Sequence, residues 1–208
     1  MNLKNYYWYF KGALSSRFCD EVIKFANNQK EHQGITGKYQ DKKLGKKEIK
    51  DLKKQRDSNI IWLNQQWIYR EIFPYINTAN KNAEWNYDID FAEECQFTKY
   101  KLNQHYDWHC DSNFEPYKNH KFYNYNGRIR KLSVTCSLSD PKEYRGGELE
   151  FNFNDPSKKK SENIRKCKEI LPKGSIVVFP SFVWHRVRPV TEGTRYSLVI
   201  WNIGYPFR

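Results

Sequence analysis

The second half of the chain alternates between apolar and polar residues with the period of a β-strand. In RKLSVTCSLS every second residue from Leu132 to Leu138 is apolar, whereas the residues between them are serine or threonine. CQFTKYKL and HYDWHC also alternate, and GSIVVFP has the pattern of a buried strand. Further strands are expected at ELEFNF, WHRVRPV and RYSLVIWNIG. The pattern predicts about seven or eight short strands from residue 94 onward. One face of RKLSVTCSLS should pack into a core, and the other could line a polar cavity.

The first half of the chain shows the period of an α-helix instead. In residues 12–29, GALSSRFCDEVIKFANNQ, apolar residues recur at helical spacing from Phe18 to Ala26. Ser15 or Ser16 can cap the start of this helix, because a serine oxygen accepts from a free backbone N–H of the first turn. The segment therefore predicts one amphipathic helix.

Two further helices are expected before the strands begin. Residues 64–83 carry a second apolar stripe, in which Pro74 should break or kink the helix. A short helix is expected near residues 46–54, inside a lysine-rich segment that also contains glycines and otherwise reads as a mobile loop.

Helices followed by many short strands, without crossover helices, predict an antiparallel sandwich or jelly roll. The fold class is therefore mainly β with flanking α, and the N-terminal helices should pack on the outer face of one sheet. The 208 residues suit one domain, with a helical part at about 1–93 and a jelly-roll core at about 94–208.

The composition is that of a folded protein, and it restricts the cellular compartment in which the protein is expected. Aromatic residues make up 17% of the chain and can build a core despite the modest hydrophobic content of 38%. No apolar run is long enough to cross a membrane, and the N-terminus does not have the pattern of a signal peptide. The five cysteines are odd in number and form no C-x-x-C, which favours a reducing compartment and predicts a cytoplasmic protein.

The net charge of +12 is concentrated in two segments. Residues 30–56 contain ten basic and four acidic residues, a net of +6, and residues 158–168 contain six basic residues and one acidic, a net of +5. Such runs are solvated surfaces in many proteins, or they attract an acidic partner such as nucleic acid. The segment 30–56 could also be a lid over a site.

The sequence HYDWHCD contains the pattern H-x-D twice, as His105 with Asp107 and as His109 with Asp111. A His and an Asp two residues apart on a strand point to the same side and can bind one metal ion. On a straight strand all four side chains share that side, so alternation alone does not choose between the pairs.

The distant His185 strengthens the metal interpretation. His109, Asp111 and His185 would supply two imidazoles and one carboxylate, the ligand set of non-haem Fe(II) oxygenases, whereas a closed zinc site needs four ligands. Arg195 follows ten residues later and could reach the same cavity, where a guanidinium suits a carboxylate ligand. The other histidines, His32 and His120, lie in polar loops and are expected to be solvent-exposed.

Three stretches, YKLNQHYDWHCD, LSVTCSLSDPKEYRGGELEF and LPKGSIVVFPSFVWHRVRPVTEGTRYSLVIW, carry a family resemblance. Over about residues 95–203 the chain resembles the 2-oxoglutarate- and Fe(II)-dependent dioxygenases, in particular their prolyl 4-hydroxylase-like branch. The family's spacing from a tyrosine to the first ligand histidine matches Tyr100 and His109, and this selects the second H-x-D. Collagen-type members carry lysine where this chain has Arg195, which leaves the substrate class open.

The resemblance implies a role for each residue of the site. His109, Asp111 and His185 would bind Fe(II), Arg195 would pair with the distal carboxylate of 2-oxoglutarate, and Tyr100 would donate a hydrogen bond to it. O2 would be the second cosubstrate and ascorbate the reductant.

The reaction implied is hydroxylation of a prolyl residue in a peptide or protein, with release of succinate and CO2. Two alternatives stay open: a nucleic-acid demethylase, which the basic segments 30–56 and 158–168 would suit, and a jelly-roll binding module without catalysis. Demethylases with this fold usually carry a second arginine six residues after the first, where this chain has Trp201.

Four further predictions concern residues near these motifs. His105 and Asp107 should support the ligands or line the rim of the pocket. Gly146 and Gly147 should form a tight turn or permit a close approach to the cavity. The side chains of Trp184 and Trp201 should lie in the core, and Cys110 should face away from the metal.

Overall fold

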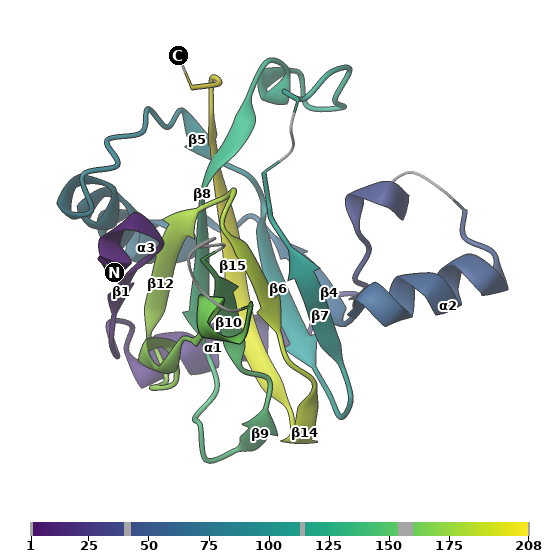
Figure 1. The fold of residues 1–208 in the computed structure, drawn as a ribbon. Coiled ribbons are helices and arrows are strands. Elements are labelled where there is room, and N and C mark those ends of the chain that lie inside the picture. Colours follow the sequence, from purple (N-terminus) through teal and green to yellow (C-terminus); the bar gives the residue numbers. More distant parts are fainter. Residues whose placement is uncertain (1, 40–42, 113–114, 154–159, 208) are drawn as a thin grey trace.

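The computed structural model describes residues 2–39, 43–112, 115–153 and 160–207. Two antiparallel β-sheets face each other, and helices cover the outer side of the larger one (Figure 1). This arrangement confirms the predicted fold class, a jelly roll with N-terminal helices packed on one sheet.

The larger sheet has eight strands and spans the chain from its N-terminal part to its C-terminal part. Its order is β1 (Trp8–Phe10), β12 (Ile176–Pro180), β8 (Ile129–Ser137), β15 (Arg195–Gly204), β6 (Cys95–Tyr100), β4 (Asn59–Leu63) and β2 (His32–Gln33), with β5 (Phe91–Ala92) also paired to β15. The long strands β8 and β15 lie at its centre and carry the most extensive pairing.

The smaller sheet has five strands and forms the opposite wall. Its order is β11 (Ile164–Lys166), β10 (Leu149–Asn152), β13 (Trp184–Val187), β7 (His105–His109) and β3 (Arg56–Asp57). A separate ribbon pairs β14 (Val190–Gly193) with β9 (Tyr144–Gly146). Both walls contribute side chains to one buried cluster, which includes Tyr100, Phe151 and Phe179.

Side-chain alternation gives the larger sheet two different faces. On β8, Leu132, Val134 and Cys136 join the core that the helices cover, whereas the serines and the threonine between them are buried on the opposite face. One of these inner residues, Thr135, lines a cavity between the sheets. The predicted division of RKLSVTCSLS into a core face and a cavity face is therefore confirmed.

Helix α1 (Ser16–Asn27) begins where its capping residue predicts. The Ser15 hydroxyl oxygen accepts a hydrogen bond from the backbone N–H of Phe18 at 3.1 Å. Phe18, Val22 and Ala26 then form one buried stripe against the larger sheet. Ser15 rather than Ser16 is therefore the cap.

Helix α3 (Gln66–Asn82) continues through Pro74, so of the predicted break or kink the break is wrong. Pro74 lies on the exposed side of the helix, where water can solvate the carbonyl that loses its partner. Ile68, Ile72 and Ile76 lie on the buried side and hold both halves of the helix to the sheet.

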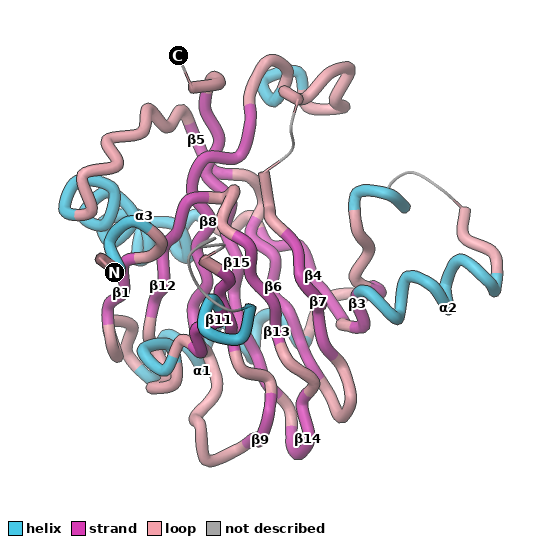
Figure 2. The backbone as a smooth tube through the Cα atoms, in the orientation of Figure 1, coloured by secondary structure: helices cyan, strands magenta, loops and turns pink. Residues whose placement is uncertain are grey.

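The N-terminal part is not only helical, because β1 to β5 come from residues before 94 and complete the two sheets. Helix α2 (Lys46–Gln55), expected near 46–54, stands out beside β3 and β7 (Figure 2). Short 3-10 helices are η1 (Leu3–Asn5), η2 (Gly37–Tyr39), η3 (Tyr123–Tyr125), η4 (Lys160–Asn163) and η5 (Lys168–Ile170). None of the described helices is long and apolar enough to cross a membrane.

The backbone at Gly174, just before β12, packs closely against the N-terminal segment at Leu14, and this contact gives a test of the fold. Gly174 has φ +78°, and a Cβ there would lie 2.0 Å from the carbonyl oxygen of Leu14. We expect Gly174→Ala to lower the free energy of unfolding by about 2–4 kcal/mol, measured by urea denaturation. Gly37 has no neighbour within 4 Å of such a Cβ, so Gly37→Ala should cost less than about 1 kcal/mol. Equal losses in the two variants would contradict this packing.

Candidate metal centre

The pairing of β7 with β13 brings two histidines together. His185 lies directly opposite His109 in this antiparallel pair. Asp111 follows β7, and its backbone N–H donates to the carbonyl of Ser181 at 2.8 Å, which fixes the turn. The Asp111 carboxylate lies 3.7 Å from Nε2 of His109 and 3.6 Å from Nε2 of His185. These three residues therefore present their ligand atoms to one point, within 4.8 Å of one another.

Backbone carbonyls hold both imidazoles in the same tautomer. Nδ1 of His109 lies 2.8 Å from the carbonyl of Asp107, and Nδ1 of His185 lies 3.0 Å from the carbonyl of Val183. A carbonyl oxygen can only accept, so Nδ1 carries the proton in each ring. The lone pair of each Nε2 is then free and faces Asp111.

The charge state of the cluster suits a divalent cation. Burial, together with the nearby His185, lowers the pKa of His109 to about 3, so this imidazole is neutral at pH 7. Burial would raise the pKa of Asp111, but the two imidazoles and the Arg130 guanidinium beside it hold that pKa below its usual value. A neutral imidazole at His109 and an ionised carboxylate at Asp111 are the protonation states that a metal ion requires of these ligands.

The ligand set matches an open site and not a closed structural one. It has two nitrogens and one oxygen, and no cysteine or fourth ligand joins the cluster among the described residues. As expected, Cys110 is absent from it, and the thiol points instead to the carbonyl of Ser112. A metal ion held by these three residues would keep positions for other ligands.

A buried arginine lies at the other end of the same cavity. Arg195 is only 2% exposed and stands opposite Tyr100 in the pairing of β15 with β6. Its Nη1 donates to the hydroxyl of Ser197 at 3.3 Å, and the guanidinium lies 5.6 Å from the centre of the Tyr100 ring. In the described part of the chain no carboxylate pairs with Arg195. A buried, uncompensated cation is costly, so this position is suited to an anionic ligand.

The two glycines that precede β10 each have a physical role. At Gly147 a Cβ would lie 2.9 Å from Cδ of Arg195, so glycine leaves room for the arginine. At Gly146 a Cβ would lie 2.3 Å from the carbonyl oxygen of Pro189, and φ is +72°. Gly147 thus permits the close approach to the cavity, and Gly146 makes the tight turn.

The cavity connects the metal cluster to Arg195. Its lining includes Tyr100, Tyr106, His109, Asp111, His185, Arg195 and Trp201. Its volume of about 40 Å³ holds roughly three water molecules. A ligand the size of a dicarboxylate would therefore enter only with some movement of the lining side chains.

The expected supporting role holds for Asp107 only through its backbone carbonyl, which binds Nδ1 of His109, and it is wrong for the side chain of His105. The pairing of β7 with β13 is irregular between Tyr106 and His109, and both of these residues face the cavity. The strand is therefore not straight, and simple alternation fails across it. His105 instead contacts helix α2, with Nε2 3.1 Å from the carbonyl of Lys54, while Asp107 is exposed.

The positions of two tryptophans, two histidines and the basic segments can also be compared with the predictions. Trp184 is 41% exposed and does not lie in the core, because the next residue, His185, takes the inward position on β13. Trp201 is buried as expected, and it also lines the cavity. His32 is exposed as expected, whereas His120 is half-buried and stacks on Tyr125 at 4.6 Å. The basic segments 30–56 and 158–168 include residues 40–42 and 158–159, which lie outside the described residues.

Sequence patterns alone missed two groups beside the cavity. Arg56, on β3, lies 4.6 Å from the ring of Tyr106, which stacks on His109 at 3.5 Å. Arg130 binds Glu93 through two hydrogen bonds of 2.8 and 2.6 Å, and its guanidinium lies 3.9 Å from the Trp201 ring. Neither arginine lies in a motif with regular spacing to His109, so only the folded chain reveals them.

The fold and the site together define a class. A jelly roll that holds two histidines and one carboxylate at an open metal position is the arrangement of non-haem Fe(II) oxygenases. The comparisons agree, because the family model of the 2OG-Fe(II) oxygenase superfamily matches residues 95–202. The chain belongs to this superfamily.

Curated relatives match half of the chain. The PKHD-type hydroxylase YbiX of Escherichia coli O157:H7 is 35% identical over 106 residues, which cover 50% of this chain and 40% of that protein. The PKHD-type hydroxylase Syncc9902_2001 of Synechococcus sp. (strain CC9902) is 39% identical over 100 residues, which cover 48% and 36%. The match thus spans about two fifths of the length of these relatives.

Solved structures match almost the whole fold at low sequence identity. The 2OG complex of the viral collagen prolyl hydroxylase from Paramecium bursaria Chlorella virus-1 has a TM-score of 0.63 at 20% identity, with 96% of both chains covered. A Pseudomonas putida prolyl-4-hydroxylase has a TM-score of 0.62 at 16% identity, covering 96% of this chain and 94% of that one. At these identities the likeness shows the fold alone.

Metal binding distinguishes the two H-x-D pairs. We expect His109→Ala to weaken Mn(II) binding by about 100-fold or more, because it removes a ligand. His105→Ala is the matched control and should keep the affinity, since this imidazole contacts α2 instead. Isothermal titration with Mn(II) measures both, and loss of binding in His105→Ala alone would contradict the assignment.

Proposed function

We propose that the protein is a 2-oxoglutarate- and Fe(II)-dependent dioxygenase that hydroxylates a prolyl residue in a peptide or protein. In this proposal His109, Asp111 and His185 bind Fe(II), and Arg195 and Tyr100 bind 2-oxoglutarate. The bound iron would supply the oxygen chemistry, in which 2-oxoglutarate and O2 yield succinate, CO2 and a hydroxylated carbon. Ascorbate would keep the metal reduced.

The observation that carries the proposal is the unpaired, buried Arg195 in the same cavity as the three ligands. A guanidinium binds a carboxylate through two parallel hydrogen bonds and does so most strongly where water is excluded. A dicarboxylate whose far end pairs with Arg195 would direct its other end toward the metal position. Tyr100 stands across from Arg195, where its hydroxyl could donate to the same ligand.

The protein's own residues would prepare the site before any substrate arrives. Carbonyls of Asp107 and Val183 fix the two imidazoles, so the ligands need no rotation on binding. Tyr106 stacks on His109 and Trp201 closes the cavity wall, and both exclude water from the reacting centre.

A peptide or protein substrate is supported by the relatives and by the fold. The curated relatives are named PKHD-type hydroxylases. One structure with this fold is a prolyl hydroxylase from Trichoplax adhaerens in complex with a hypoxia inducible factor peptide fragment. It has a TM-score of 0.63 at 17% identity and covers 95% of this chain and 83% of that one. Nothing among the described residues favours nucleic acid as the substrate. A cytoplasmic location stays a prediction from cysteine usage.

Loss of the arginine should affect the cosubstrate and not the metal. We expect Arg195→Gln to raise the KM for 2-oxoglutarate by about 100-fold, the loss typical of a buried charge pair, while Mn(II) affinity stays within about threefold. Arg188 is exposed, so Arg188→Gln should leave this KM unchanged. Steady-state succinate release measures the effect, and an unchanged KM in Arg195→Gln would contradict the assigned role.

The reaction itself is tested by following both products. Protein loaded with Fe(II), 2-oxoglutarate and ascorbate should release succinate and add one oxygen to proline-containing peptides, as detected by mass spectrometry. Peptides with alanine in place of proline are the control and should gain no oxygen. Turnover on methylated DNA or RNA in place of the peptides would overturn the peptide assignment, and absence of both Fe(II) binding and turnover would overturn the enzyme assignment.

A further inference from the structure

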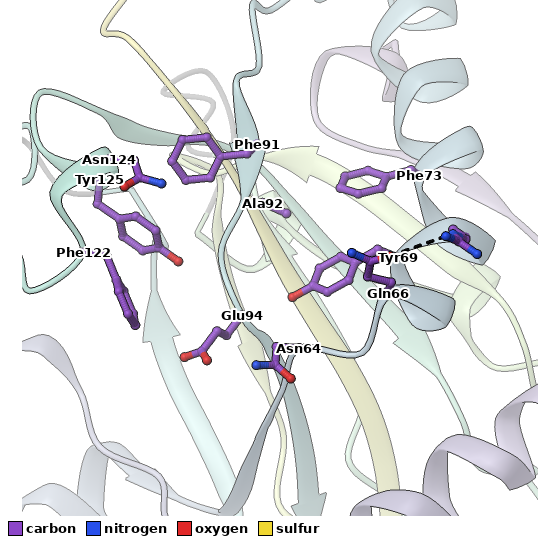
Figure 3. A pocket seen from close by; sticks show the side chains of 11 residues that line it. Asn64, Gln66, Tyr69, Phe73, Phe91, Ala92, Glu94, Phe122, Asn124 and Tyr125 are labelled. Atoms are coloured by element: carbon purple, nitrogen blue, oxygen red, sulfur yellow. Dashed lines mark hydrogen bonds between the residues drawn. The ribbon is translucent and has the colours of Figure 1, made fainter.

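An aromatic cleft lies outside the metal cavity. Its volume is about 600 Å³, and α3, the segment at β5 and the turn at η3 form its walls. Figure 3 shows the rings of Tyr125 and Phe122 on one side and those of Tyr69 and Phe73 on the other, with Glu94 between them. None of these residues contacts the three metal ligands.

Glu94 is the unusual group in this cleft. Its side chain is half-buried, and within the described residues no ion pair or side-chain hydrogen bond involves its carboxylate. The preceding residue, Glu93, is fully satisfied by Arg130 and by the Tyr117 hydroxyl. Two neighbouring carboxylates therefore differ: one is used inside the protein and the other is open to a ligand.

Three cations of the chain lie near the cleft, and one of them, Arg70, is among its lining residues. In the described part of the chain none of the three forms an ion pair with Glu94. Arg128 pairs with Asp90 and lies over the Phe91 ring, Arg70 donates to the Gln66 carboxamide at 3.4 Å, and Lys121 lies over the Phe122 ring. In a chain with a net charge of +12, a carboxylate without a basic partner is notable. Among the described residues that line the cleft, Glu94 is the acidic one, and a cation from another molecule can pair with it.

The rings complete a cation-binding environment. Aromatic faces attract ammonium and guanidinium groups, and the attraction increases when water is partly excluded. Tyr69 and Phe73 stack on each other at 5.7 Å, and Phe122 and Tyr125 pair at 5.4 Å, so both walls are preformed. A long side chain with a terminal cation would place its methylene groups against these rings and its charge beside Glu94.

The cleft and the metal cavity adjoin one short segment of chain. The Glu93 side chain binds Arg130, whose guanidinium lies over Trp201 at the cavity wall. The next side chain, Glu94, lines the cleft. One short segment of chain, Glu93 and Glu94, therefore links the wall of the metal cavity to the cleft.

We propose that this aromatic cleft is a docking site for a lysine or arginine side chain of the polypeptide that the metal site hydroxylates. The proposal rests on the proposed function for the identity of the ligand, and on Glu94 and the surrounding rings for its chemistry. It makes the basic residue a determinant of substrate choice, separate from the proline.

A double-mutant cycle tests the docking site directly. The probes are proline-containing peptides in which a single lysine occupies successive positions, and matched peptides with norleucine there, which removes the charge and keeps the chain. Affinities are measured by titration calorimetry on the whole protein with Mn(II) and 2-oxoglutarate, in the absence of oxygen. At one or more positions lysine should bind about fivefold tighter than norleucine, and Glu94→Gln should abolish that preference.

A second acidic residue, Glu192, provides the matched control. Glu192 is exposed and far along the chain on β14, so Glu192→Gln removes one negative charge and should keep the lysine preference. A preference that survives Glu94→Gln, or no preference at any position, overturns the docking site. A preference that depends on Glu94 in a protein that hydroxylates no peptide would support the cleft and contradict only the proposed reaction.

Discussion

The site depends on one strand register, the pairing of β7 with β13. His185 stands opposite His109 only in this register, and a slip by one residue would turn one imidazole to the other side of the sheet. The irregularity next to this pair directs Tyr106 into the cavity together with His109. Ser181 then holds the turn after β7 and brings Asp111 to the same point. The metal position is thus a consequence of backbone pairing.

The larger sheet supplies the second half of the site through its two faces. Its outer face is apolar and covered by α1 and α3, which makes it a rigid wall. Its inner face carries Tyr100, Thr135 and Arg195, polar groups that burial makes costly unless a ligand satisfies them. The outer face therefore serves stability, whereas the inner face combines packing against the smaller sheet with binding capacity.

The alternating pattern predicted much of this from sequence. RKLSVTCSLS is a central strand with strict alternation, so the assignment of its faces is confirmed, and RYSLVIWNIG is a strand beside it as predicted. The spacing to Tyr100 singled out the H-x-D that lies in the cluster, although alternation left both pairs open. His105 could not be placed, because its partner is a backbone carbonyl of α2 and the strand between it and His109 is irregular. The aromatic cleft was also beyond the sequence, since it joins three segments that share no periodic pattern.

The most direct test of the central claim is anomalous diffraction from crystals of the protein grown with Mn(II) and 2-oxoglutarate. We expect one strong peak about 2.0–2.3 Å from Nε2 of His109, Nε2 of His185 and a carboxylate oxygen of Asp111. The electron density of the cosubstrate should run from that peak to the Arg195 guanidinium. A peak bound by His105 or Asp107, or cosubstrate density that leaves Arg195 unpaired, would contradict the site.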